Sequence, residues 1–244
     1  MEYNEIAPCS TLKPFIHAFW ELKGDDSDNQ WERIFPDGCS GLIFNMGDTC
    51  VTDNGKVKID FGKTYVAGTM TSFKDSLIDS STHLIGVCLK PAVLSDFYNF
   101  VPQSEIINQT VLLEDSRSFD IDKIIKSSTE YLNIFFLNRL QHRNGYLKSV
   151  IEHIHAAKGK LSIDAIAKKS FTTIRDLERK FKVEIGISPK EYSRIVRFQN
   201  ALAKIADTKR ERSLSDIAVE CGYYDHAHLT NEFKRNTGHV PSQF

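Results

Sequence analysis

Arginine, histidine, amide and hydroxyl side chains are concentrated in two short stretches of the last third of the chain, residues 173–182 and 226–235. Such side chains form hydrogen bonds with the edges of base pairs in the grooves of a duplex. Lysine and arginine beside them pair with phosphates, and these contacts position a protein without reading sequence. The residue types therefore indicate recognition of a nucleic acid.

Within these stretches we expect two kinds of contact. Arg175 and Arg179 are the best candidates for bidentate contacts with guanine. The alternative for any single residue is a solvated surface side chain. The residues expected at base edges are Thr173, Arg175, Glu178, Arg179, His226, His228, Thr230 and Asn231. Those expected at phosphates are Lys182, Arg194, Lys234 and Arg235.

One sequence motif occurs twice and places the two stretches at equivalent positions. The units cover about residues 161–192 and 214–244, and Ile166-Ala167 matches Ile217-Ala218 at an offset of 51. Later matches have an offset of 52, which indicates one inserted residue in the second turn. These later pairs are Phe181 and Phe233, Gly186 and Gly238, Pro189 and Pro241, and Tyr192 and Phe244.

Each copy is typical of a helix-turn-helix unit. A leucine and a phenylalanine four residues apart form the buried face of the second helix. We expect this helix to begin after Thr172 or Thr173 in the first copy and after Asp225 in the second. Gly222 can adopt positive φ in the second turn. The buried pairs are Leu177 with Phe181 and Leu229 with Phe233.

A helix over about residues 189–206 is expected to connect the units, because apolar residues recur there at helical spacing. About 17 residues of helix span roughly 25 Å. Successive major-groove faces of B-DNA lie roughly 34 Å apart, so this helix plus the width of the units could place both second helices in adjacent major grooves. Such rigid spacing would favour a bend in the DNA.

The two units resemble the double helix-turn-helix domain of the AraC/XylS family of bacterial transcription regulators. The most specific part is the stretch Gly222-Tyr-Tyr-Asp-His-Ala-His-Leu-Thr-Asn-Glu-Phe-Lys-Arg-Asn-Thr-Gly-His-Val-Pro241. The first unit departs from the family at its turn, where it has Ser170-Phe171 and members often have Ser-Gly. The resemblance implies binding to double-stranded DNA, and contact with RNA polymerase if the protein is an activator.

The charge distribution supports two domains. Residues 145–244 contain 18 Lys and Arg against 12 Asp and Glu, a net charge of +6, whereas residues 1–144 contain 13 against 20, a net charge of −7. A basic C-terminal part is suited to phosphate contact. We expect an N-terminal domain over 1–143, a linker at Asn144-Gly145, and a DNA-binding domain over 145–244.

The N-terminal part is expected to be a β-rich barrel or sandwich with helices, so the fold class is α+β. Its strands are predicted at Phe15–Leu22, Trp31–Phe35, Leu42–Asn45, Lys56–Phe61, Lys63–Ala67 and His83–Leu89. Pro36-Asp-Gly38 and Asn54-Gly55 are hairpin signals. Helices are predicted over about 92–100 and 119–143, the latter in two pieces near Ser127-Ser128. The resemblance to AraC-type regulators implies that those last helices form a homodimer interface; the alternative is that they only cover the barrel.

Two short stretches, Ile34-Phe-Pro-Asp-Gly-Cys39 and Gly86-Val-Cys-Leu-Lys-Pro91, resemble the cupin-like sensor domains found fused to AraC-type units. The resemblance implies a small-molecule effector in the N-terminal domain. The candidate pocket residues are Trp20, Trp31, Arg33, Tyr65 and His83. Each has an ordinary core or surface position as its alternative.

No catalytic signature is recognisable, and we expect neither an enzyme nor a cofactor. His153/His155 and His226/His228 are two residues apart, which places each pair on different faces of a helix and disfavours a metal site. Cys39 could be a reactive sensor thiol, but a buried structural cysteine is favoured. The five cysteines are scattered, and we find no signal peptide and no segment long enough to span a bilayer, so a cytoplasmic protein is expected.

Two other classes of function stay open. One is a cupin-type enzyme that carries a DNA-binding domain, which metal analysis would test. The other is a regulator whose N-terminal domain binds a protein and no small ligand. A thermal-shift screen would test the latter, because a ligand that binds only the folded state raises its stability.

Overall fold

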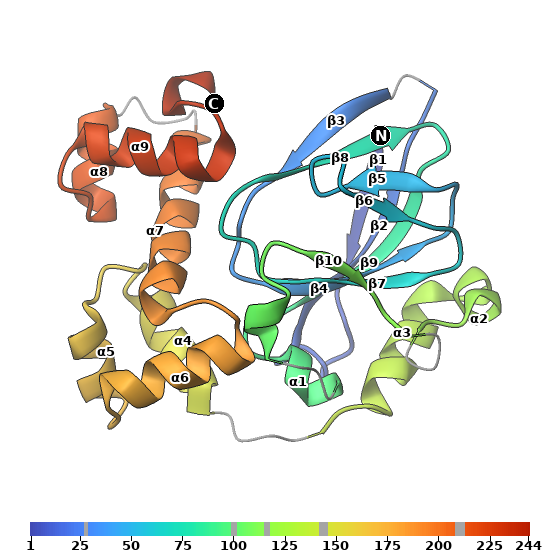
Figure 1. Ribbon diagram of the computed structural model, residues 1–244, viewed down its shortest axis with the longest axis horizontal. Coiled ribbons are helices and arrows are strands. Elements are labelled where there is room, and N and C mark those ends of the chain that lie inside the picture. Colours follow the sequence, from blue (N-terminus) through green and yellow to red (C-terminus); the bar gives the residue numbers. More distant parts are fainter. Residues whose placement is uncertain (27–28, 99–101, 115–117, 142–145, 208–212) are drawn as a thin grey trace.

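The computed structural model describes residues 1–26, 29–98, 102–114, 118–141, 146–207 and 213–244. A β-rich domain is followed by a helical domain, and the two lie side by side (Figure 1). The predicted fold class is therefore confirmed. The expected linker Asn144-Gly145, and the last residues of the expected helices 92–100 and 119–143, lie outside the described residues.

An antiparallel sheet of six strands forms the centre of the N-terminal domain. Its order is β1 (Glu2–Ile6), β2 (Ile16–Lys23), β9 (His83–Leu89), β4 (Ser40–Asn45), β7 (Thr64–Ala67) and β10 (Thr110–Leu112). Two small sheets accompany it: β3 (Asn29–Ile34) pairs with β8 (Lys74–Asp79), and β5 (Cys50–Thr52) pairs with β6 (Val57–Ile59).

Alternating side chains divide between the two faces of the large sheet, as the twofold period of a strand requires. On β4, Leu42 and Phe44 pack in the core beneath the helices, whereas Ile43 packs in the smaller cluster that contains Cys50 and Ile59 of the β5–β6 ribbon. The helical face is covered by α1 (Leu94–Phe97), α2 (Ile121–Lys126) and α3 (Ser128–Leu137). The central strands of the large sheet are thus covered on both faces, whereas the edge strand β1 is exposed.

The helices α2 and α3 are separated at Ser127, close to the predicted break. Phe135 and Phe136 of α3 are buried against the sheet, while Ile125, Ile134 and Leu137 are exposed on the outer surface. These helices therefore cover the sheet. The exposed apolar residues on their outer faces are available for a second copy of the chain, so the predicted dimer interface stays a proposal.

Several details differ from the expectations. Four strands were not expected, namely β1, β5, β8 and β10. They are short, or they are recognised only by their pairing with strands distant in the sequence. Asn54-Gly55 does lie in the β5–β6 hairpin, with positive φ at both residues. The hairpin predicted at Pro36-Asp-Gly38 is wrong: β3 pairs with β8, and β4 pairs with β7 and β9. These residues instead face the helical domain.

The predicted helix over 92–100 is also shorter than expected, since α1 has only four residues. Ala92 has a φ of 64°, which prevents the helix from extending back to Pro91, and Tyr98 is already extended. A short 3-10 turn, η1 (Gln103–Glu105), follows and reaches toward the helical domain.

The C-terminal domain consists of six α-helices within the described residues. They are α4 (Tyr146–Ala156), α5 (Ile163–Lys169), α6 (Ile174–Glu184), α7 (Pro189–Ile205), α8 (Leu214–Cys221) and α9 (His226–Thr237), followed by a 3-10 turn η3 (Pro241–Gln243). Two separate cores form. Tyr192 and Ile195 of α7 belong to the first, and Phe198 and Ala201 belong to the second. The connecting helix is therefore shared by both units.

The turns of the two units have the same hydrogen bonds. In the first, the N–H of Thr172 donates to Ala167 and Phe171 has a φ of 51°. In the second, the N–H of Tyr223 donates to Ala218 and Gly222 has a φ of 79°. Phe171 thus adopts the left-handed conformation that glycine adopts in the second unit, so the departure in sequence does not alter the turn.

No helix of the described residues is both long and apolar enough to cross a membrane.

Candidate nucleic-acid interface

The second helix of each unit, α6 or α9, buries one face and exposes the other; we call these two helices the recognition helices after their predicted role. On α6, Leu177 and Phe181 are fully buried, and on α9 Leu229 and Phe233 are fully buried. The opposite face carries most of the residues predicted to contact DNA. The exposed ones are Thr173, Arg175, Glu178, Arg179, Lys182, His226, His228, Asn231, Lys234 and Arg235. Both helices run toward the N-terminal domain, so that their N-terminal ends lie on the side away from it (Figure 1).

Among the residues expected at base edges, Thr173, Arg179 and Thr230 have side-chain hydrogen bonds within the protein. Thr173 is the N-cap of α6, and its hydroxyl oxygen accepts the N–H of Asp176 at 3.1 Å. The hydroxyl of Thr230 donates to the carbonyl of His226 at 2.8 Å. Arg179 donates to the carboxylate of Asp176 at 2.7 Å. Arg179 is largely exposed, so its guanidinium can exchange this partner for a base.

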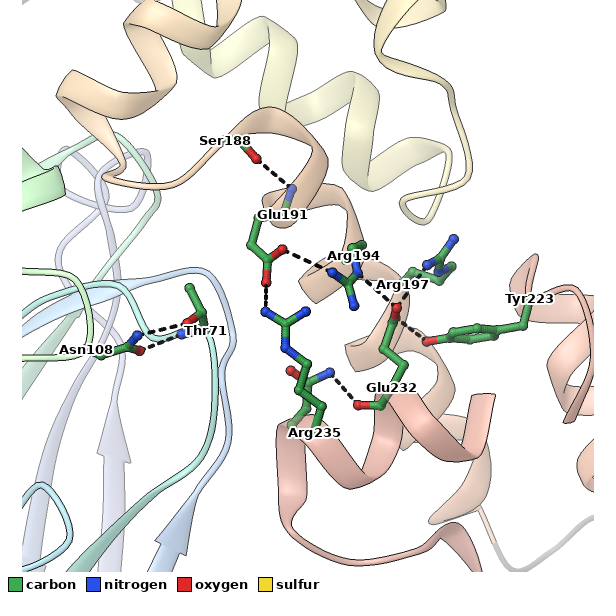
Figure 2. Close-up of polar contacts among 10 residues, drawn as sticks. Thr71, Asn108, Ser188, Glu191, Arg194, Arg197, Tyr223, Glu232 and Arg235 are labelled. Carbon is green, nitrogen blue, oxygen red and sulfur yellow. Dashed lines mark hydrogen bonds and ion pairs between the residues drawn. The ribbon is translucent and has the colours of Figure 1, made fainter. Parts of the chain in front are cut away.

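A buried carboxylate organises the second unit (Figure 2). Glu232 of α9 is 3% exposed, and its Oε2 accepts N–H groups of Arg194 and Arg197 of α7, both at 3.1 Å. Its Oε1 accepts the hydroxyl of Tyr223 at 2.8 Å. Burial, and next the negative charge of Glu232, raise the pKa of Tyr223, which therefore stays protonated as a donor. Glu232 thereby joins the connecting helix to the second recognition helix.

Glu191 of α7 extends this network. Its side chain accepts hydrogen bonds from Arg194 at 3.3 Å and from Arg235 at 2.6 Å. Arg194 and Arg235 are therefore engaged within the protein, and Lys182 and Lys234 are the more accessible of the residues expected at phosphates. Sequence reasoning missed Glu232 and Glu191, because neither has a counterpart at the repeat offset that would single it out.

The N-terminal domain contacts both units at equivalent positions. The hydroxyl of Thr69 donates to the carbonyl of Ile185 at 2.8 Å, and Arg33 donates to the carbonyl of Thr237 at 3.0 Å. Ile185 and Thr237 are 52 residues apart, which is the offset of the repeat. Each carbonyl belongs to the end of its recognition helix. The N-terminal domain thus contacts the equivalent carbonyl in both units.

The glycines that follow these carbonyls allow the close approach. Gly186 has a φ of 96°, and a Cβ there would lie 2.8 Å from the carbonyl oxygen of Gln103 in η1. Gly238 has a φ of 75°, and a Cβ there would lie 2.6 Å from the guanidinium of Arg33. The motif glycines therefore serve the interface between the domains as well as the helix ends.

A cleft of about 990 Å³ lies between the two domains. Phe15 and Val93 line it from the N-terminal domain, and Leu147 and Ile151 line it from α4. Its charged groups are three lysines (Lys13, Lys90 and Lys148) and four carboxylates (Asp37, Asp96, Glu152 and Glu184). His155 also lines it, and its Nε2 lies 2.8 Å from the hydroxyl of Tyr192. Partial burial lowers the pKa of His155, which favours the neutral ring at this contact.

The five residues proposed from the sequence as pocket candidates do not form one pocket, and none of them lines this cleft. Trp20 and Tyr65 pack in the cluster under the β5–β6 ribbon. Trp31 is half-exposed, and His83 pairs with Glu21 at 2.8 Å. Arg33 pairs with Asp75 at 2.7 Å and contacts the second unit.

One group of potential metal ligands adjoins the cleft. The ligand atoms of Asp37, Cys39 and Cys88 all lie within 4.8 Å of one another. A hydrogen bond with Cys88, then burial and the negative charge of Asp37, hold the pKa of Cys39 well above its ordinary value. The sequence did not reveal this group, because Cys88 is far from the other two along the chain.

Two family models match the chain. Residues 166–244 match a family described as "Helix-turn-helix domain", and residues 4–112 match a "Domain of unknown function (DUF6597)". The C-terminal domain is of the AraC type. The matched residues of the AraC-type domain contain both recognition helices and the connecting helix.

Two curated relatives match part of the chain. The HTH-type transcriptional activator RhaS of Escherichia coli is 31% identical over 78 residues, which are 32% of this chain and 27% of RhaS. The urease operon transcriptional activator of Escherichia coli is 29% identical over 136 residues, which are 56% of this chain and 44% of that protein. The match therefore spans less than half the length of either relative.

Solved structures resemble the whole chain in fold. A structure of ToxT from Vibrio cholerae has a TM-score of 0.53 at 10% identity and covers 100% of this chain and 97% of that one. A structure of ToxT with a bound unsaturated fatty acid has a TM-score of 0.51 at 12% identity and covers 92% of each chain. The arrangement of a β-rich domain followed by a helical domain is thus shared.

Proposed function

We propose that this protein is a transcription regulator that binds double-stranded DNA through α6 and α9 and reads one asymmetric site with two unequal units. The observation that carries the proposal is the pair of exposed recognition faces on helices that one connecting helix holds. The two faces differ in chemistry, since α6 offers arginines and α9 offers histidines and Asn231. Such a regulator acts in the bacterial cytoplasm, without catalysis, and contacts RNA polymerase if it activates.

The N-terminal domain, in this proposal, controls the two units together. Thr69 and Arg33 contact equivalent carbonyls at the ends of α6 and α9. A change in the position of the N-terminal domain would therefore alter both recognition helices at once. An effector acts only if it binds one arrangement better than another.

The effector site that we propose is the cleft between the domains. Its apolar lining suits an amphipathic molecule. Lys13, Lys90 and Lys148 supply amines for an anionic group of that molecule, although the cleft also contains the carboxylates Asp37, Asp96, Glu152 and Glu184. The fatty acid in one ToxT structure is a ligand of this chemistry. A thermal-shift screen with long-chain carboxylic acids and their neutral amides tests it, with stabilisation expected from the acids alone.

DNA recognition is tested by selecting bound fragments from genomic DNA and measuring affinity at the selected site and at unrelated DNA. We expect Arg179→Ala to weaken binding at the selected site by about 1–3 kcal/mol. The affinity for unrelated DNA should change little. Lys234→Ala should weaken both and reduce the salt slope by about 1.

Lys123→Ala is the matched control, because Lys123 is an exposed lysine of α2 in the N-terminal domain. It removes one positive charge and should leave both affinities unchanged. Equal losses at all sequences for Arg179→Ala would contradict base contact by this residue. Failure to enrich any site would contradict the proposed function itself.

A homodimer is a further part of the proposal. The exposed Ile134 and Leu137 on α3, with Ile125 on α2, provide an apolar outer face. Sedimentation of the full chain tests it: a dimer that dissociates on Ile134→Glu is expected, and a monomer at all concentrations would exclude it.

A further inference from the structure

We propose that Asp37, Cys39 and Cys88 form a site for a thiophilic divalent cation of the Zn²⁺ type at the boundary between the two domains. Two thiolates and one carboxylate are a ligand set that suits zinc. The site is distinct from the DNA-binding faces and does not depend on the proposed function.

The distances fit this coordination. Zinc binds sulfur at about 2.3 Å and carboxylate oxygen at about 2.0–2.2 Å, so that ligand atoms of a tetrahedral site lie roughly 3.5–4 Å apart. The three ligand atoms already lie within 4.8 Å of one another without an ion. Small side-chain rotations would therefore complete the contacts.

The strands and the loop bring these ligands together. Gly41 of β4 lies directly opposite Cys88 of β9 in the antiparallel register, so no side chain of β4 separates Cys88 from Cys39, two residues before Gly41. The N–H of Cys39 donates to the Oδ1 of Asp37 at 2.8 Å, which turns this carboxylate toward the thiols. Diagonal neighbours on one sheet face lie within reach of each other's side chains.

The loop that carries two of the ligands also contacts the DNA-binding domain. Gly38 lies between Asp37 and Cys39, and its φ of 82° brings its backbone against the ring of Tyr192. The carbonyl of Pro36 accepts the side-chain N–H of Gln199 at 2.6 Å. Tyr192 and Gln199 both belong to α7, the helix shared by the two units. A cation would tie this loop to β9 and thereby fix its contact with α7.

Asp37 and Cys39 line the cleft, so the site has an entry path and room for a water or ligand oxygen at the fourth position. When the cation binds, the two thiols each release a proton to solvent and bind as thiolates. The carboxylate binds in its ionised form and releases no proton. No oxidation is involved.

Titration of the reduced full chain with Co²⁺ tests the site, because cobalt bound by thiolates gives a sulfur-to-metal charge-transfer band in the near ultraviolet. We expect one cobalt per chain with this band, displacement by Zn²⁺, and a rise in melting temperature on addition of Zn²⁺. Cys39→Ser and Cys88→Ser should each remove the band and the rise, and Asp37→Asn should weaken binding at least tenfold.

Cys9→Ser is the matched control, since Cys9 is another half-buried thiol of the same domain and packs on the opposite, helical side of the sheet. It should keep the band and the rise. Absence of the band in the unaltered chain would overturn the proposal even if a serine variant failed to fold. It would also be overturned if the band survived in both serine variants. These readouts involve no DNA, so failure of the proposed function would leave them unchanged.

Discussion

At the scale of single residues, Glu232 shows how one buried charge is compensated in this protein. The carboxylate accepts hydrogen bonds from two guanidiniums and one phenol, which satisfy an anion that burial would otherwise disfavour. Because the three donors come from α7 and from the turn before α9, the interaction fixes the second recognition helix against the connecting helix.

We therefore expect Glu232→Gln to lower the free energy of unfolding by about 2–3 kcal/mol, because the neutral amide leaves Arg194 and Arg197 without their anion. Chemical denaturation measures this. Asp164→Asn is the control, since Asp164 and Lys168 form an exposed ion pair, with side-chain exposures of 58% and 77%. This substitution should leave stability nearly unchanged. Similar losses for the two variants would show that the buried network contributes no more than a surface pair.

At the scale of elements, the start of each recognition helix is set by one side chain. Thr173 caps α6 and Asp225 caps α9, and their oxygens accept the N–H of the residue three positions later. The two caps lie 52 residues apart, whereas the preceding turns lie 51 apart. The extra residue of the second turn thus falls between the turn and the cap, as the repeat predicted.

Replacement of the first cap separates its structural role from the base contact proposed for it. Thr173→Ala should cost about 1 kcal/mol of stability through loss of the cap and should also weaken DNA binding. Thr173→Asp keeps a capping oxygen and adds negative charge at the DNA face. It should retain stability and still lose affinity, as thermal melting and DNA titration would show. Full affinity in Thr173→Asp would contradict a position at the DNA.

At the scale of the whole molecule, the contact between the two domains includes a position that only glycine fits. Gly38 fits against Tyr192 because it has no Cβ; an added Cβ would lie 2.7 Å from the ring. The loop predicted as a hairpin is in fact the part of the N-terminal domain that reaches the connecting helix. A side chain as small as a methyl group at position 38 would therefore disturb the contact between the domains.

Gly38→Ala is expected to separate the loop from α7 and to lower stability by about 1–2 kcal/mol more than Gly62→Ala. Both glycines have positive φ, 82° and 71°, so both variants carry the same backbone strain, but Gly62 has open space around it. Thermal melting gives the difference, and small-angle scattering should show a larger radius of gyration for Gly38→Ala alone. Equal melting temperatures would show that the close approach is not needed.

The amino-acid sequence by itself determined the features that depend on local spacing. The repeat predicted two helix-turn-helix units. The separation of four residues between Leu177 and Phe181 predicted which face of α6 is buried. Asp225 was predicted as a cap from its type and position. These features follow from contacts between residues close along the chain, where helical geometry fixes which side chains share a face.

Only the tertiary structure decided which distant residues meet. Cys88 comes beside Cys39 because β9 pairs with β4, and Glu232 comes beside Arg197 because α9 packs on α7. The contact of Thr69 with Ile185 joins two domains. No period or spacing encodes these pairs, since they depend on the register of strands and the docking of domains, which the whole chain settles together through burial of its apolar surface.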